Sequence, residues 1–236
     1  MSKQKILISG CGISWSGQEG RKTWGNILKV AGVDIVDTGG PAVSNQWILN
    51  RAIEYVLHNS VDAVVIQLSS LGKLDVEVTS ERELSLVQPD TLRNFVIDGV
   101  WPSSASLEHP SKKMWYDYLY SPRLELQDIK IKLELLKFYC KHNNIQLLVL
   151  KGYDLPNCDF NDLIYNEVPL YDQYLSNPMY VYHDEAKQMS VPCIEFQFTL
   201  AYLIIKALGI DVIPRLDVIQ AQYWQKNNLQ SQKTLL

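Results

Sequence analysis

Reactive side chains stand beside a glycine turn near the start of the chain, in residues 5–24 (KILISGCGISWSGQEGRKTW). The turn is Gly10-Cys11-Gly12, and the hydroxyls of Ser14 and Ser16 follow it in the same loop. Glycines two apart let the backbone turn sharply and approach a ligand closely, because neither carries a Cβ atom. The Cys11 thiol is a potential nucleophile, but nothing basic stands beside it in the sequence, which favours a buried structural cysteine.

A strand and a helix must position this stretch. The apolar run Ile6–Ile8 predicts a short buried strand, and the spacing of Trp24, Ile27 and Leu28 predicts a helix over about 23–31. A strand, a glycine turn and a helix in this order are typical of open α/β sheets, which bind ligands beyond the carboxyl ends of their strands. Many domains begin in this way without chemistry at the turn, so the layout alone does not assign a function.

The rest of the chain repeats the pattern and predicts the fold class. Strands over about 33–37 and 62–68 alternate with a helix over 46–58, which Ser44 or Asn45 can cap. A long helix after Pro122, a strand over 145–150, a fifth strand near 179–182 and a helix over 195–208 follow. The prediction is one α/β domain over 1–236, a three-layer α/β/α sandwich with a central parallel sheet of about five strands.

Residues 71–121 interrupt this rhythm after the third strand. A connection of this length inside a compact domain is usually functional or a lid, so the segment is predicted to be an insertion. It contains an aromatic cluster: Trp101, Trp115, Tyr116, Tyr118 and Tyr120. Such rings anchor interfaces, but they also fill small satellite cores, so a ligand or partner surface and simple packing both stay open.

Composition excludes several classes of protein. The chain has 236 residues, a net charge of -4 and no visible basic patch, which argues against nucleic acid as the main partner. Its 4 cysteines are scattered without a C-x-x-C pair, and no His or carboxylate pair shows ligand spacing, so neither a metal nor a cofactor is predicted. The N-terminus is already the first strand and no apolar run could span a membrane, so a cytoplasmic protein is expected.

The order of several short motifs carries a resemblance. Gly10-Cys11-Gly12, Thr23-Trp24, Gly39-Gly40, Ser44-Asn45 and Val65-Ile66-Gln67 stand after or within the first three strands. In this order they resemble a Gly-Cys-Ser branch of the SGNH (GDSL) hydrolase superfamily, and the segment from Val191-Pro192 to the helix with Ala201 is similar to the end of that family's pattern. The resemblance covers most of the chain outside the insertion. It implies an α/β/α sandwich and ester hydrolysis.

The catalytic positions depart from that family pattern. In the matching register, Gly12 takes the place of the nucleophilic serine and Val191 that of the histidine before proline. Glycine has no side chain to attack an ester, and valine cannot act as a base. Gln67 or Ser69 lies near the asparagine of the third block and could still donate to an oxyanion.

Other residues could restore the chemistry that the family pattern implies. Ser14 or Ser16 could be the nucleophile, although a lone loop serine is usually a turn or cap residue. His109, in a His-Pro-Ser run of the insertion, could fold over the site as the base, although a surface histidine before proline is far more common. His183 could act from near the fifth strand, but its neighbour Asp184 would point to the opposite face.

Three classes of function therefore remain. The first is a degenerate SGNH-fold protein that binds a glycan, an acyl group or a protein without cleaving it, at a pocket lined by Gly10, Cys11, Gly12, Gly39, Gly40, Ser44, Asn45, Gln67 and Ser69. The alternative is an active serine esterase or acylhydrolase on acylated carbohydrate or a similar ester. The third is an assembly protein, oligomeric or virion-associated, since the branch it resembles is met in phage and bacterial genomes.

Overall fold

A computed structural model gives the arrangement of the chain. It describes residues 4–11, 23–40, 43–77, 100–103, 115–152, 155, 158, 160–164, 181–184, 189–192 and 194–233. Side chains are described in these ranges except at 74–77, 100–103, 115–116, 161, 181–184, 189–192, 195 and 226–233.

The centre of the molecule is a parallel sheet. In the described part of the chain it has four strands in the order β2-β1-β3-β6: β1 (Lys5–Gly10), β2 (Asp34–Asp37), β3 (Ala63–Leu68) and β6 (Gln146–Lys151). Every pair in the sheet is parallel, so all four carboxyl ends lie at the same edge. The predicted β-α-β-α-β start and the parallel sheet are confirmed.

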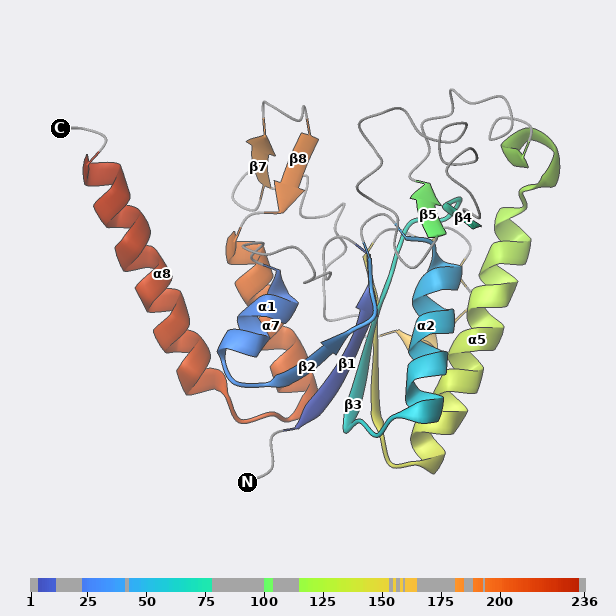
Figure 1. Ribbon diagram of the computed structural model, residues 1–236, viewed down its shortest axis with the longest axis horizontal. Helices are drawn as coiled ribbons and strands as arrows, with labels where there is room; N and C mark the ends of the chain where they lie inside the picture. Colours follow the sequence, from blue (N-terminus) through green and yellow to red (C-terminus); the bar gives the residue numbers. More distant parts are fainter. Residues whose placement is uncertain are drawn as a thin grey trace.

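Helices cover both faces of this sheet (Figure 1). On one face α1 (Trp24–Val30) packs against α7 (Ile194–Leu208), and α8 (Ile213–Lys233) contacts both. On the other face α2 (Asn45–His58) packs against α5 (Pro122–His142). The three-layer α/β/α architecture expected from the sequence is therefore present.

Residues with particular backbone or capping chemistry set the helix ends, and the sequence predicts two of them, Ser44 and Pro122. Ser44 is the N-cap of α2 and accepts a hydrogen bond from the backbone N–H of Trp47 at 3.1 Å. Pro122 occupies the first turn of α5, where its missing N–H has no partner to lose. After α1, Gly32 adopts a φ of +95°, the left-handed conformation that ends many helices.

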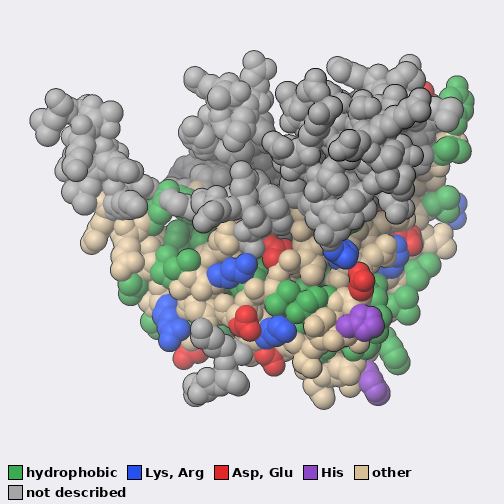
Figure 2. All heavy atoms as spheres, in the orientation of Figure 1, with side chains coloured by type: hydrophobic (Ala, Val, Ile, Leu, Met, Phe, Trp, Pro, Cys, Tyr) green, Lys and Arg blue, Asp and Glu red, His purple; other side chains and the backbone are tan. Residues whose placement is uncertain are grey.

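Charged side chains are spread over the surface. On the face shown in Figure 2, Lys and Arg side chains alternate with Asp and Glu across the described elements. None of the described helices has the length and hydropathy that crossing a bilayer requires.

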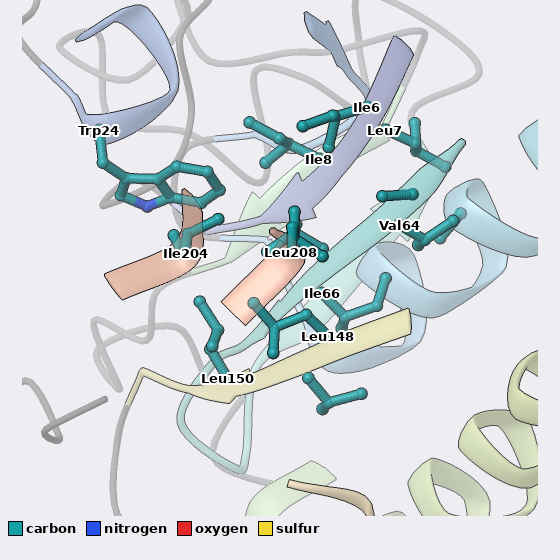
Figure 3. Close-up of a cluster of buried hydrophobic side chains, with 14 of the residues drawn as sticks. Ile6, Leu7, Ile8, Trp24, Val64, Ile66, Leu148, Leu150, Ile204 and Leu208 are labelled. Atoms are coloured by element: carbon teal, nitrogen blue, oxygen red, sulfur yellow. The ribbon is translucent and has the colours of Figure 1, made fainter. Parts of the chain in front are cut away.

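One hydrophobic core joins the three layers. All six residues of β3 are buried, as expected for a strand covered on both faces. Figure 3 shows Trp24 of α1 and Ile204 and Leu208 of α7 in one cluster with side chains of β1, β3 and β6. Fully burying a side chain of this kind contributes about 1.5–3 kcal/mol, so the packing of the layers is the main source of stability.

Two buried polar contacts also fix helices in place. Ser9 of β1 donates its hydroxyl to the carbonyl oxygen of Ile48 in α2 at 2.7 Å. Across the other face, Gln197 of α7 accepts a hydrogen bond from the backbone N–H of Trp24 at 2.8 Å. That N–H belongs to the first turn of α1, where no helical acceptor exists, so the amide satisfies it.

The remaining strands form two hairpins outside the sheet. β4 (Leu74–Glu77) pairs antiparallel with β5 (Val100–Ser103), and β7 (Val181–Asp184) with β8 (Met189–Pro192). The predicted fifth strand is thus present as β7, but it pairs with β8 and does not join the parallel sheet. A nearby antiparallel partner closes a short loop, which costs less chain entropy than docking on a distant sheet edge.

Two short helical turns complete the described elements. They are the π-helix η2 (Trp115–Leu119) and the 3-10 helix η3 (Asn161–Leu163). Most of the predicted insertion, 71–121, lies outside the described residues, so the single-domain division stays a prediction.

Candidate functional site

The carboxyl edge of the sheet brings together the residues predicted to line a site. β1 ends at Gly10, which is in register with Gln67 near the end of β3, and Gln67 is in turn in register with Leu150 of β6. The loop after β2 reaches the same edge, because the N–H of Gly40 donates to the carbonyl oxygen of Gly10 at 3.1 Å. Ligands bind at this edge in open α/β sheets, so its polar groups are the candidates for a site.

Gly39, in the loop after β2, allows this loop to pass close to the backbone of β1. A Cβ on Gly39 would lie 2.4 Å from the carbonyl oxygen and 2.9 Å from the nitrogen of Gly10. The N–H of Gly39 donates to a carboxylate oxygen of Asp37 at 2.9 Å, which fixes the turn. The requirement for glycine here is therefore explained by packing, whether or not a ligand approaches.

Asn45 holds the end of β3 against the start of α2. This fully buried amide accepts from the N–H of Ser69 at 2.7 Å and donates to the carbonyl oxygen of Ser69 at 3.1 Å. Its Nδ2 also lies 3.4 Å from the carbonyl oxygen of Ser70 and 3.5 Å from Oε1 of Glu125. Since both ends of its amide are used inside the protein, Asn45 acts as a structural clamp.

Two charged residues that the sequence reading missed complete this cluster. Lys73 donates to the Ser69 hydroxyl at 2.5 Å. Glu125, at the start of α5, accepts from the N–H of Gly72 at 2.8 Å and from the Tyr120 hydroxyl at 2.9 Å. Lys73 follows Ser69 by four residues across a turn with Gly72 at a φ of +78°, a local signal that could have been read. No neighbouring residue in the sequence indicates that Glu125 belongs to this cluster, because its partners Gly72 and Asn45 are 53 and 80 positions away.

Gln67 differs from Asn45 and Ser69 because its side-chain oxygen forms no hydrogen bond within the described part of the protein. The residue is 2% exposed, and its Oε1 is buried without a hydrogen-bond partner among the described residues. Its side chain lies beside Gly152, where an added Cβ would come within 3.6 Å of the Gln67 Cγ and Nε2 and within 2.6 Å of the Leu68 carbonyl oxygen. Glycine at 152 is therefore required by the close approach to the Leu68 carbonyl oxygen, whereas the Gln67 side chain is at ordinary contact distance.

The other predicted site residues divide into two groups. Cys11 is buried directly after β1, and Ser44 caps α2, so both lie at this edge. Gly12, Ser14, Ser16 and His109 lie outside the described residues. His183 lies in β7 and Val191 in β8, for which the backbone alone is described. The predicted pairing of a serine with a histidine therefore stays a prediction.

A metal is not indicated by the described side chains. In that part of the chain no three His, Cys, Asp or Glu residues gather closely enough to hold an ion. What the described edge offers a ligand is the buried amide oxygen of Gln67.

Comparison with known proteins gives fold-level likenesses. No protein-family model matches the chain, and no curated protein does. Similar solved structures include TesA, with 16% identity over 87% of this chain and 99% of that one and a TM-score of 0.47. A GDSL-like lipase from Bacteroides thetaiotaomicron has 16% identity over 87% and 88%, with a TM-score of 0.45. The acetyl xylan esterase Est2A from Butyrivibrio proteoclasticus has 14% identity over 89% and 66%, with a TM-score of 0.38.

Of these structures, the Bacteroides lipase is named GDSL-like, the superfamily that the sequence motifs resemble. Their identities and TM-scores are too low to carry an argument about this chain. The α/β/α architecture rests instead on the strand order and pairing described above.

Proposed function

We propose that this chain is an SGNH-hydrolase-like protein whose catalytic triad is degraded and that it binds a ligand at the carboxyl edge of its sheet without cleaving it. The observation that carries the proposal is the Oε1 of Gln67, which is buried and finds no partner in the part of the chain that the structure describes. A buried polar group left unpaired costs about 1–3 kcal/mol, so such a group calls for an explanation, and a ligand is one.

The chemistry of the amide favours one class of ligand. An amide oxygen accepts a hydrogen bond and so matches a hydroxyl or an N–H group, not an oxyanion. A glycan presents many hydroxyls, and it therefore suits this acceptor better than a bare acyl chain. Gly12 and Val191, at the positions of nucleophile and base in the family pattern, support binding without turnover.

Ligand binding can be tested by thermal shift with a panel of neutral oligosaccharides. A ligand that binds the folded chain raises its melting temperature by mass action. We expect at least one glycan to do so with the wild-type chain and to lose its effect with Gln67→Met. A panel without any shift, or shifts that Gln67→Met leaves intact, would count against Gln67 as the contact.

One observation keeps an esterase as the second candidate. Cys11 lies at the carboxyl edge, and Ser14 follows it by three residues. Three residues span at most about 10 Å, so the chain length alone allows Ser14 to serve as a nucleophile at this edge. A nucleophile there needs a base, for which His183 and His109 are the predicted residues.

An ester assay separates the two candidates. We expect no turnover of p-nitrophenyl acetate or butyrate above that of a heat-denatured sample, and no labelling by a fluorophosphonate probe. Turnover that disappears in Ser14→Ala or Ser16→Ala would establish the esterase instead. Loss in His183→Ala with retention in His109→Ala, or the reverse, would then identify the base.

A further inference from the structure

The outer face of α5 carries a line of exposed apolar side chains. Leu124, Ile131, Leu135 and Phe138 are 64%, 52%, 60% and 73% exposed. Their spacing of seven, four and three residues is the a/d pattern of a coiled-coil seam. Figure 2 shows hydrophobic side chains along the edge of the molecule that α5 occupies in Figure 1.

The fold itself does not need this second apolar face. The inner face of α5 already packs on the core through Leu126, Ile129, Leu133, Leu136 and Cys140. The Tyr139 hydroxyl donates to the carbonyl oxygen of Val56 in α2 at 2.8 Å, which fixes the rotation of α5 on the sheet. An amphipathic surface helix has one apolar stripe, so a second stripe on the outside indicates a contact with another molecule.

We propose that this face binds a second copy of the chain, with the two α5 helices antiparallel. In antiparallel pairs an a residue packs against a d residue of the other helix. One register sets Leu135 against Phe138 of the partner subunit, and the two-fold axis forms this contact twice. It also sets Ile131 against His142 of the partner subunit. Within one chain the His142 ring stacks on the Phe138 ring, with centroids 6.5 Å apart, so both rings belong to the same apolar surface.

Charges beside the seam select the same register. It brings Glu134 opposite Lys141 of the partner subunit, and the two-fold axis makes this pair twice. Within one helix the two residues are seven positions and about 10 Å apart, too far to pair with each other. The described part of the chain gives neither side chain an ion-pair partner, so both charges are available to the second copy.

Alternative arrangements lack this complementarity. Moving the antiparallel register by one heptad sets Asp128 against Phe138 of the partner subunit and Glu134 against its own copy. Asp128 already pairs with Lys132 at 2.8 Å, and burying it under a ring would cost that pair its hydration. A parallel dimer would set Glu134 beside the partner's Tyr139 and would form no opposite-charge pair along the seam.

Sedimentation equilibrium of the full chain tests the proposal. We expect a monomer–dimer equilibrium that Leu135→Lys abolishes and that Val30→Lys, at an exposed valine of α1, leaves unchanged. Circular dichroism should show that both variants stay folded, because both positions are on the surface. A monomer at every concentration, including one that binds other proteins through α5, would overturn the proposal, as would a dimer that Leu135→Lys does not affect.

A charge exchange tests the register. Glu134→Lys and Lys141→Glu should each weaken the dimer by about tenfold or more, because each places like charges in contact. The double variant Glu134→Lys/Lys141→Glu should recover most of the lost affinity, since the opposite-charge pairs are formed again with exchanged signs. Failure to recover would refute the antiparallel register proposed here. None of these outcomes depends on whether the carboxyl edge of the sheet binds a ligand.

Discussion

Replacing Gln67 by methionine should make the protein more stable. The residue is 2% exposed, and its Oε1 has no hydrogen-bond partner in the described structure. An unsatisfied buried polar group costs about 1–3 kcal/mol. Methionine has a similar length and no polar group to satisfy, so Gln67→Met should recover a large part of that free energy. For a chain of this size, each kcal/mol corresponds to roughly 2–4 °C in melting temperature.

The matched control is the same substitution at Gln197. This residue is 4% exposed, but its Oε1 accepts from the Trp24 N–H at 2.8 Å. Gln197→Met would leave that buried N–H without an acceptor, so it should destabilise the fold by about 1–3 kcal/mol. The two variants have equal chemistry and nearly equal burial, and they should shift stability in opposite directions.

Urea unfolding followed by circular dichroism measures both changes. The dependence of the unfolding free energy on urea should stay the same in both variants, so that midpoints can be compared directly. If Gln67→Met destabilises the chain as much as Gln197→Met does, the Gln67 amide is satisfied in the apo protein. The proposal that the Gln67 amide oxygen is a contact for a ligand would then fail.

Three further changes follow from the geometry and the titrating groups. Gly39→Ala would place its Cβ 2.4 Å from the Gly10 carbonyl oxygen, so it should destabilise the fold by about 1–3 kcal/mol or more in urea unfolding. Burial raises the pKa of Cys140 to about 11, so this thiol should resist Ellman's reagent in mild alkali until the chain is unfolded. Burial first, and then the hydrogen bond and charge of Asp217, raise the pKa of Tyr202 to about 12, and Asp217→Asn should lower it in an ultraviolet phenolate titration. Since the unfolded phenol titrates near 10.0, the contribution of Tyr202 to stability is complete below that pH and is lost as pH rises towards 12.

The sequence predicts most of the fold because the signals for it are local. A run such as Ile6–Ile8 has to be buried, and Ser44 and Pro122 mark helix starts by their own backbone chemistry. The hairpin of β7 and β8 was not predicted, since an apolar segment shows that a strand exists but not which strand it pairs with. The local sequence pattern therefore predicts where helices and strands lie, whereas the structure is needed to show which strands pair.

The candidate site is harder to predict because it depends on contacts between distant residues. Asn45 and Ser69 are 24 positions apart, and Asn45 and Glu125 are 80 apart. Two buried glutamines also look alike in the sequence, whereas the structure pairs Gln197 and leaves Gln67 without a partner in its described part. Whether a polar residue is used internally is a property of three-dimensional neighbours.

The residues at the carboxyl edge fall into two kinds: those that the fold needs without a ligand, and those that it does not need. Gly39 is needed for the close approach to Gly10, and Asn45 clamps Ser69 to α2. Removing either should unfold the edge, so loss of binding in such variants would say nothing about contact with a ligand. Gln67 is different, because the apo fold gains nothing from its amide oxygen in the described structure. A variant that becomes more stable and at the same time loses a ligand has not lost it through unfolding, so the change must act at the site itself. Opposite changes in stability and binding at Gln67 are therefore the evidence that separates a binding residue from a structural one at this edge.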